Sequence, residues 1–412
     1  MAHGEAFSRE FNGLTRAQDT LPTEYYFDPA HHARELREIW GRNWIYLCRA
    51  SELPETGDFR LFDIAGQEIV LLRDREGGLR GFHNTCRHRG SALCLEARGK
   101  LKGGRLTCPY HQWTYALDGR LVATGAMREV EGFDRKNFSL YGVAVDVWRG
   151  FVFANLLGES APPLMDAIGE ETEPLANWPL EGLVVGHRFE KTLECDWKLF
   201  WENFNECLHC PNLHPELSEL VPIYGRAIMV QRDDPEWRAH DGESDPRFTG
   251  RLRDGAESWT MDGAPRGRVF PELTEMERAA GHTYVVSMPS VFIVGHVDYV
   301  RSVRIAPAGP GRMTLTAEWL FAPETLADPG FDAEETARFA TLVLEQDGGA
   351  CEMNQRGLRS DQHRAGVLMQ EEYEVFAFQE WVRRQLGEAG GSMRPGSRAS
   401  RRRRDDATES AE

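Results

Sequence analysis

One stretch, reading DWKLFWENFNECLHCPNLHPEL over residues 196–217, constrains this chain more than any other. Its apolar residues run nearly all the way round a helical projection, which predicts a buried helix over 197–209. Polar side chains nevertheless share one stripe of that helix. They are Glu202, Asn203, Glu206 and His209. Because buried charges are costly unless they are paired or bound to metal, the stripe indicates a functional site.

A second histidine, His214, follows His209 after four intervening residues, with Pro211 between them. Pro211 is expected to break the helix, so that the bent chain brings both imidazoles to one ion. Two histidines and one distant carboxylate form the facial triad of non-haem Fe(II) oxygenases, which leaves coordination positions open. The alternative is a buried histidine pair that is satisfied by backbone hydrogen bonds.

Composition narrows the class of protein. A chain of 412 residues is too long for one small core and predicts two or more domains. The net charge of −17 argues against nucleic acid and anionic membranes as partners, and no apolar run is long enough to span a bilayer. The eight cysteines are spaced irregularly, which favours metal ligands or buried thiols over a disulfide framework. We therefore expect a reducing, cytoplasmic location.

A small all-β domain is predicted from Trp44 to about Leu156, where short alternating runs are separated by glycine-rich turns. Asp118-Gly119 between two of these runs is a hairpin signal. Farther along, strands are predicted at HRFEKTLEC, TYVVSM, VFIVG, VDYVRSVRIAPAG and RMTLTAEWLFAP, before a long helix from about Asp332. This second part indicates an α+β domain with an antiparallel sheet wrapped on helices.

The all-β domain carries two Cys–His pairs. Cys86 and His88 form the first, Cys108 and His111 form the second, and nineteen residues separate His88 from Cys108. Two cysteines on one iron and two histidines on the other are the ligands of a Rieske [2Fe–2S] cluster. A zinc site is disfavoured, because each pair here mixes one Cys with one His, unlike a zinc finger.

The segments CRHRGS, CPYHQWTYALDG and NFNECLHCPNLHPEL together resemble the Rieske non-haem iron oxygenases, the ring-hydroxylating α-subunit family, over roughly residues 20–386. The resemblance implies an α+β fold, in which a Rieske domain (43–156) precedes a catalytic domain with a helix-grip-like sheet (157–386). An N-terminal segment (1–42) is expected to pack on the catalytic domain. The tail 387–412, including Arg401–Arg404, is expected to be disordered and solvated.

The third iron ligand is expected on the long helix. Phe339, Val343 and Asp347 share one face, so that Asp347 lies on a mainly apolar stripe. The resembling subfamily has a Gln-Asp step there, and Gln346-Asp347 matches it. We favour Asp347 as the ligand over Glu345.

The resemblance also implies a mechanism and partners. A separate reductase, using NAD(P)H and flavin, or a ferredoxin, feeds electrons to the cluster and on to the iron, where O2 meets a small-molecule substrate. Electrons cross between subunits of an expected homotrimer through an acidic residue, and Glu206 fits that bridge between His111 of one subunit and a ligand histidine of the next. The alternative is that Glu206 only orients His209.

Glu206, the segment SWTMDG at 258–263 and the Gln346-Asp347 step resemble the quaternary ammonium subfamily that acts on glycine betaine and carnitine. Hydroxylation of an N-methyl group would release formaldehyde. Aromatic faces would surround the cation, and Arg301 or Arg304 would bind a carboxylate. The aromatic candidates are Phe204, Trp259, Phe292 and Tyr299. The alternatives are an aromatic-ring hydroxylase, an O-demethylase, or a Rieske electron-transfer protein.

Overall fold

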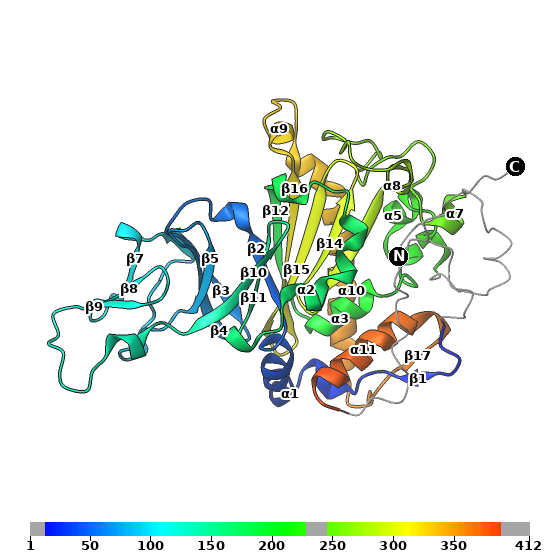
Figure 1. The fold of residues 1–412 in the computed structure, drawn as a ribbon. Coiled ribbons are helices and arrows are strands. Elements are labelled where there is room, and N and C mark those ends of the chain that lie inside the picture. The colour runs from blue at the N-terminus through cyan, green and yellow to red at the C-terminus, as the bar shows by residue number, and fades with distance from the viewer. Residues whose placement is uncertain (1–12, 228–244, 389–412) are drawn as a thin grey trace, which may run out of the picture.

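The computed structural model describes residues 13–227 and 245–388. The described chain forms two lobes, a β-rich lobe on the left of Figure 1 and a mixed lobe on the right. Most of the predicted disordered tail, including Arg401–Arg404, lies outside the described residues. Gly387 and Glu388 are described, and Glu388 pairs with Arg34 at 2.7 Å, so the predicted start of the tail at residue 387 is wrong. The architecture is α+β, with antiparallel sheets in both lobes, as the alternating sequence runs predicted.

The β-rich lobe holds a seven-stranded sheet in the order β2-β11-β10-β5-β4-β3-β6 and a three-stranded sheet in the order β7-β8-β9. The strands are β2 (Ile45–Arg49), β3 (Asp58–Ile64), β4 (Gln67–Arg73), β5 (Leu79–His83), β6 (Arg98–Lys100), β7 (Arg105–Thr107), β8 (Trp113–Ala116), β9 (Leu121–Thr124), β10 (Gly142–Trp148) and β11 (Phe151–Asn155). The turn at Asp118-Gly119 joins the antiparallel strands β8 and β9, which confirms the predicted hairpin. Gly119 has a φ of 85°, a conformation that glycine adopts without strain.

The mixed lobe is built on a five-stranded antiparallel sheet in the order β12-β16-β15-β14-β13. The strands are β12 (Val184–Leu193), β13 (His282–Ser287), β14 (Val291–His296), β15 (Val300–Gly309) and β16 (Arg312–Phe321). Each coincides with a predicted strand to within a few residues. Successive side chains point to opposite faces, so Val303 and Ile305 enter one apolar cluster and Val300 and Leu320 another.

Two helices, α3 (Trp197–Phe204) and α10 (Ala333–Leu358), pack on one face of this sheet, and α11 (Tyr373–Gln385) packs on α3. In Figure 1 they lie together beside the sheet, on the side away from the β-rich lobe. The predicted start of α10 is confirmed, because Asp332 caps it by accepting hydrogen bonds from the backbone of Glu334 and Glu335. Asp196 caps α3 through the backbone N–H of Lys198.

The remaining helices are short. They are α1 (Pro29–Glu35), α2 (Leu164–Ile168), α4 (Cys210–Leu213), α5 (Pro215–Leu220), α7 (Pro246–Thr249), α8 (Glu275–Ala280) and α9 (Pro323–Leu326). Strand β1 (Gln18–Asp19) pairs with β17 (Val367–Leu368), which attaches the N-terminal segment beside α11.

The helix predicted over 197–209 is wrong at its C-terminal end. It stops at Phe204, and His209 instead caps α4. Glu206 accepts a hydrogen bond from the backbone N–H of Leu208, which replaces the bond that a continuing helix would need. Pro211 does not break a helix but lies in the first turn of α4, where its missing N–H is harmless.

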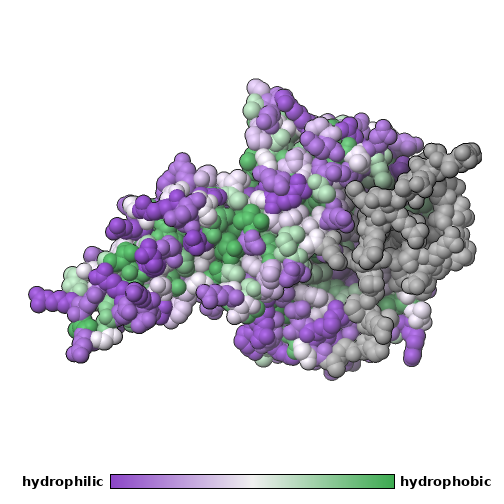
Figure 2. Space-filling model, viewed as in Figure 1, coloured by the Kyte–Doolittle hydropathy of each residue, from purple (hydrophilic) through white to green (hydrophobic). Residues whose placement is uncertain are grey.

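The surface gives two further facts. Figure 2 shows hydrophobic residues gathered near the middle of the visible face, where the two lobes meet, with hydrophilic residues around them. Across residues 13–227 and 245–388, no helix has both the length and the apolar character that a membrane span requires.

Candidate metal centre

Three side chains meet beside α10. Asp347 Oδ1 lies 2.9 Å from His214 Nε2 and 3.4 Å from His209 Nε2. The two imidazole rings are 5.1 Å apart and nearly perpendicular, at 78°. The residues come from separate elements, because His209 and His214 flank α4 and Asp347 lies in the middle of α10.

The outer nitrogen of each imidazole is held by a side-chain oxygen. His209 Nδ1 donates to Glu206 Oε1 at 2.6 Å, and His214 Nδ1 donates to Gln346 Oε1 at 2.7 Å. With a proton on each Nδ1, both Nε2 atoms turn toward Asp347, as in histidines that bind a metal. The sequence pointed to Gln346 only as the neighbour of Asp347, and its contact with His214 could not be read from spacing.

The three groups share protons. Burial alone lowers the pKa of His209, but hydrogen bonds with Asp347 and Glu206 outweigh it and raise the pKa to about 9. The pKa of His214 is also raised, because its bond with Asp347 outweighs burial. Burial works against the Asp347 carboxylate, yet the two imidazoles hold its pKa below the usual value. A metal ion would take the place of the shared protons.

This donor set fits Fe(II). Two imidazole nitrogens and one carboxylate oxygen point at one another from three sides, and the outer contacts that orient the rings are present. Asn203 Nδ2 also approaches His209 Nε2, at 3.4 Å.

A disulfide joins Cys207 and Cys210 immediately beside this group. The irregular cysteine spacing predicted buried thiols, so this pair is a correction. Cys207 lies in the turn after α3 and Cys210 is the first residue of α4, and the early end of α3 allows them to meet. Cys210 Sγ lies 3.8 Å from His209 Nε2, and both cysteines pack against Tyr224 and Tyr373.

The two Cys–His pairs lie on neighbouring loops of the β-rich lobe. Cys86 and His88 follow β5, and Cys108 and His111 connect β7 to β8. Both cysteines are buried, and the two rings are 4.8 Å apart at 78°. His88 stacks on Trp113, with its buried Nδ1 without a hydrogen-bond partner among the described residues. Two buried thiols below two imidazoles fit the ligands of a Rieske cluster.

Hydrogen-bonding groups of the protein surround the two cysteine thiols. Burial raises the pKa of Cys86 even though Tyr115 bonds to its sulfur, at 3.3 Å. Burial also acts on Cys108, but the backbone N–H groups of His111 and Tyr110 outweigh it, and the Cys108 pKa is lowered. Tyr115 is fully buried, and sequence reasoning missed its contact with Cys86.

The predicted substrate residues fall into two groups. Phe204 and Phe292 stack at 4.3 Å, beside Tyr284. Trp259 and Tyr299 lie together elsewhere, where Tyr299 Oη donates to the Trp259 carbonyl at 2.9 Å.

The two candidate arginines also separate, because positions 301 and 304 point to opposite faces of β15. Arg301 lies over the Trp259 ring at 5.7 Å. Arg304 instead donates to Thr316 Oγ1, at 3.3 Å, and faces the carboxylates of Glu318 and Glu190. Only Arg301 therefore lies with the candidate aromatic residues.

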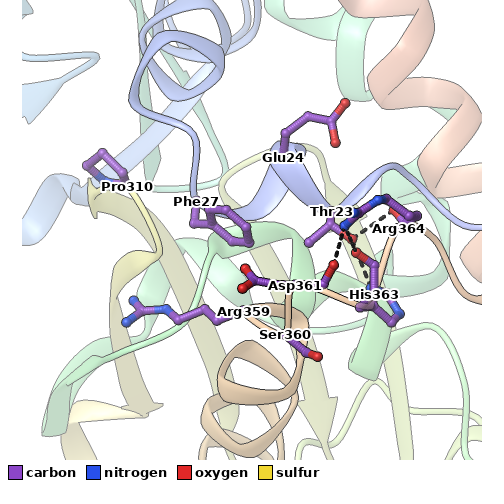
Figure 3. Close-up of a pocket in the computed structure, with 9 residues that line it drawn as sticks. All are labelled: Thr23, Glu24, Phe27, Pro310, Arg359, Ser360, Asp361, His363 and Arg364. Atoms are coloured by element: carbon purple, nitrogen blue, oxygen red, sulfur yellow. Dashed lines mark hydrogen bonds between the residues drawn. The ribbon is translucent and has the colours of Figure 1, made fainter.

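A cavity of about 560 Å³ opens away from this chemistry, between the N-terminal segment and the end of α10 (Figure 3). Thr23 Oγ1 there bonds to His363 Nδ1 and donates to the Arg364 carbonyl, both at 2.8 Å. Figure 3 shows these contacts at one end of the cavity. The lining includes none of the predicted site residues, so we regard this cavity as a gap where the N-terminal segment packs against the end of α10.

Two family models match the chain. The Rieske [2Fe-2S] domain model matches residues 43–134, and the model described as ring hydroxylating alpha subunit (catalytic domain) matches residues 180–388.

Similar proteins span most of the chain. The glycine betaine monooxygenase oxygenase subunit of Chromohalobacter salexigens is 31% identical, over 88% of this chain and 84% of its own length. The structure is similar to that of the quaternary ammonium Rieske monooxygenase CntA in complex with γ-butyrobetaine, with a TM-score of 0.67 at 22% identity, covering 93% of this chain and 99% of that one. It is equally similar to naphthalene 1,2-dioxygenase from Rhodococcus sp. (TM-score 0.68, 20% identity, 90% and 95% covered). These structural likenesses show the fold alone.

Proposed function

Because this chain belongs to the ring-hydroxylating α-subunit family of Rieske non-haem iron oxygenases, we propose that it is the terminal oxygenase of a system that removes an N-methyl group from a quaternary ammonium compound. Membership makes it an oxidoreductase with a [2Fe–2S] cluster and a mononuclear iron. The catalytic-domain match over residues 180–388 is incompatible with a pure electron carrier.

We assign the iron to His209, His214 and Asp347, and the convergence of their donor atoms is the observation that carries the proposal. We assign the cluster to Cys86, His88, Cys108 and His111. When bound, the cluster supplies single electrons and the iron activates oxygen. The protein orients the imidazoles through Glu206 and Gln346 and limits the access of water, since the His209 and Asp347 side chains are only 16% and 15% exposed.

The reaction balances with two electrons and two protons. One oxygen atom enters a C–H bond of the N-methyl group, and the other leaves as water. The resulting hemiaminal loses its C–N bond, which yields a tertiary amine, formaldehyde and a proton. The electrons come from a separate reductase or ferredoxin.

The choice of substrate is supported by the glycine betaine relative, whose likeness extends over most of both chains. Phe204 and Phe292 supply aromatic faces of the kind that binds quaternary ammonium groups. The test is a single turnover of the chemically reduced holoenzyme with O2, against methylated ammonium compounds and aromatic acids. Formaldehyde from one ammonium compound supports the proposal. A hydroxylated aromatic acid without formaldehyde would replace it by ring hydroxylation.

We further propose a homotrimer in which electrons cross between subunits. In Figure 1 the strands β7 and β8, which flank His111, lie at the far left of the molecule, whereas α3 and α10 lie on the other side of the five-stranded sheet. Leu95 and Tyr110, close to the cluster loops in sequence, are 72% and 62% exposed, which suits docking of this tip onto a second copy.

Glu206 would bridge the two subunits. Its carboxylate contacts its own His209, which is one half of such a bridge and also the contact expected of a residue that only orients the ring. We predict that Glu206→Ala keeps cluster absorbance and iron content but loses at least 100-fold in single-turnover rate. A variant with normal turnover would rule out the bridge. A variant that instead loses its iron would leave Glu206 an orienting role.

A further inference from the structure

Several buried donor groups gather around the Trp259 ring. His296 lies 5.4 Å from it between ring centroids, and the Arg301 guanidinium lies 5.7 Å away. Trp259, His296 and Arg301 are only 6%, 0% and 5% exposed. All three come from the face of the mixed lobe that α10 covers, since Phe339 of α10 packs edge-on against Trp259, at 5.9 Å.

Most polar side-chain atoms of these three residues have no hydrogen-bond partner among the described residues. Trp259 Nε1, Arg301 Nε, Arg301 Nη1 and both ring nitrogens of His296 are buried without a hydrogen bond. No carboxylate in the described part of the chain forms an ion pair with Arg301. Asp298, the nearest acidic residue in sequence, accepts from Ser258 Oγ and from the backbone of Arg266 and Gly267. The Asp347 carboxylate acts on Arg301 electrostatically but forms no ion pair with it, so the buried guanidinium lacks a hydrogen-bonded counter-charge, which a ligand carboxylate would supply.

We propose that Arg301, Trp259 and His296 form an anion-binding end of the substrate pocket that holds a carboxylate on the substrate. Arg301 offers two donors in the planar fork that matches a carboxylate, and Trp259 adds one N–H. This inference rests on the proposed function and narrows it, because it requires a zwitterionic betaine in place of a simple quaternary cation.

The same charge argues that the ammonium group lies elsewhere. A second cation on the Trp259 ring would be repelled by Arg301, so Trp259 is a poor face for the ammonium group. Phe204 and Phe292 are better placed. Phe204 ends α3 two residues before Glu206, and Phe292 lies four residues before His296 on β14, about 13 Å along a strand.

The orientation of the substrate in the pocket follows from this arrangement. The reacting N-methyl group must lie at the iron site, so the carboxylate must point away from it. Phe339, which contacts Trp259, lies two helical turns before Asp347, about 12 Å along the axis of α10. The anion-binding end and the candidate iron site therefore lie along one helix, and they are near enough for the Asp347 carboxylate to act electrostatically on Arg301.

The test measures binding without turnover. Reduced holoenzyme is titrated by calorimetry in the absence of O2 with glycine betaine, γ-butyrobetaine and choline, which lacks a carboxylate. We expect at least one carboxylated compound to bind at least tenfold more tightly than choline. Arg301→Met should weaken binding of that compound by about 10–100-fold and change choline binding less than threefold. Arg301→Lys should restore part of the loss, because it keeps the charge but not the fork.

Arg304→Met is the matched control, since Arg304 lies three residues away on the opposite face of β15. It should leave all three dissociation constants unchanged. Trp259→Phe removes the N–H donor and also shrinks the ring. It should weaken the carboxylated compounds by about 3–10-fold relative to choline, which keeps the proposal testable if Arg301→Met does not fold. Cluster absorbance and thermal unfolding verify that each variant is folded.

Equal binding of choline and the betaines, or an unchanged binding ratio in Arg301→Met, would overturn the proposal. Its failure can be told apart from failure of the proposed function. If formaldehyde forms but the ratio of choline to betaine dissociation constants does not depend on Arg301, the proposed function is supported and the anion-binding end is wrong. If the betaines bind through Arg301 but no formaldehyde forms, the anion-binding end is supported and N-demethylation is wrong.

Discussion

At the scale of single residues, the outer contacts of the two imidazoles decide how well the candidate iron site is organised. Glu206 is charged and Gln346 is neutral, so the two histidines have different electrostatic surroundings. Burial lowers the pKa of His209, but hydrogen bonds to Asp347 and then to Glu206 outweigh burial and raise it to about 9. His214 relies on a neutral amide for its orientation.

Gln346→Leu should therefore lower iron affinity by about 10–100-fold, because His214 loses the oxygen that fixes its ring. The measurement is iron bound per chain after dialysis against graded chelator, with cluster absorbance as an internal reference. Glu216→Gln is the control, since Glu216 contacts only the far side of Gln346, at 3.3 Å from Nε2. Iron retention equal to that of the wild type would show that His214 needs no such support.

Glu202 should make stability depend on pH. Burial raises its pKa to about 7, more than the hydrogen bonds from Tyr26 and Gln379 lower it. The folded pKa is above the unfolded value, so its contribution is present at acidic pH and is lost as pH rises toward 7. Glu202→Gln should remove this loss. We expect it to be more stable than the wild type by about 1–2 kcal/mol at pH 8 and no more stable at pH 4.5. Urea unfolding at both pH values measures the difference in stability between the variant and the wild type. The same difference at both pH values would exclude a role for Glu202.

At the scale of elements, α10 has to approach the sheet closely just where it presents Asp347. A Cβ on Gly348 would lie 2.8 Å from Leu193 Cδ2 of β12, whereas one on Gly349 would meet nothing within 4 Å. The two adjacent glycines therefore have different reasons to be present. Gly348 allows contact with the sheet, and Gly349 only weakens the helix.

The two alanine variants should consequently diverge. Gly349→Ala should stabilise the protein by about 0.5–1 kcal/mol through helix propensity. Gly348→Ala gains the same propensity but overpacks against Leu193, and we expect it to be less stable than Gly349→Ala by about 1–3 kcal/mol. Chemical denaturation with iron analysis measures both effects. Equal stability of the two variants would mean that β12 and α10 separate without cost.

At the scale of the whole molecule, the candidate cluster and iron sites occupy separate lobes of one chain (Figure 1). Apolar residues of both lobes join in two shared clusters, which hold the lobes against each other. Electron transfer within one chain would have to cross this packed interior. Transfer to a neighbouring copy would instead start from the exposed tip around Tyr110.

Mixing two inactive variants tests this route. Cys108→Ser should lack the cluster, and Asp347→Ala should lack the iron. If electrons cross between subunits of a trimer, co-expression in equal amounts should recover about a quarter of wild-type activity, because each mixed trimer has one competent pair of sites, although each variant alone has none. Mass determination in solution gives the number of subunits. Mixed oligomers that stay inactive, while both folded variants are present, would place the transfer within one chain.

The sequence by itself determined the family, the kinds of metal ligand and most of the strands. Ligand types and their spacing are local, so the Cys–His pairs and the two histidines of NECLHCPNLH are readable without a structure. Alternating apolar residues predicted β12 to β16, and a long helix was predicted from about Asp332, where α10 begins. Each of these signals lies within a few neighbouring residues.

Only the tertiary structure decided how distant residues combine. The end of α3 at Phe204 depends on a carboxylate turning back to the backbone, and the joining of Cys207 to Cys210 follows from that turn. The separation of Arg301 from Arg304 depends on which face of β15 the helices cover. Sequence spacing does not show how a turn closes or which face of a strand is covered, because the packing around the turn and the strand establishes both.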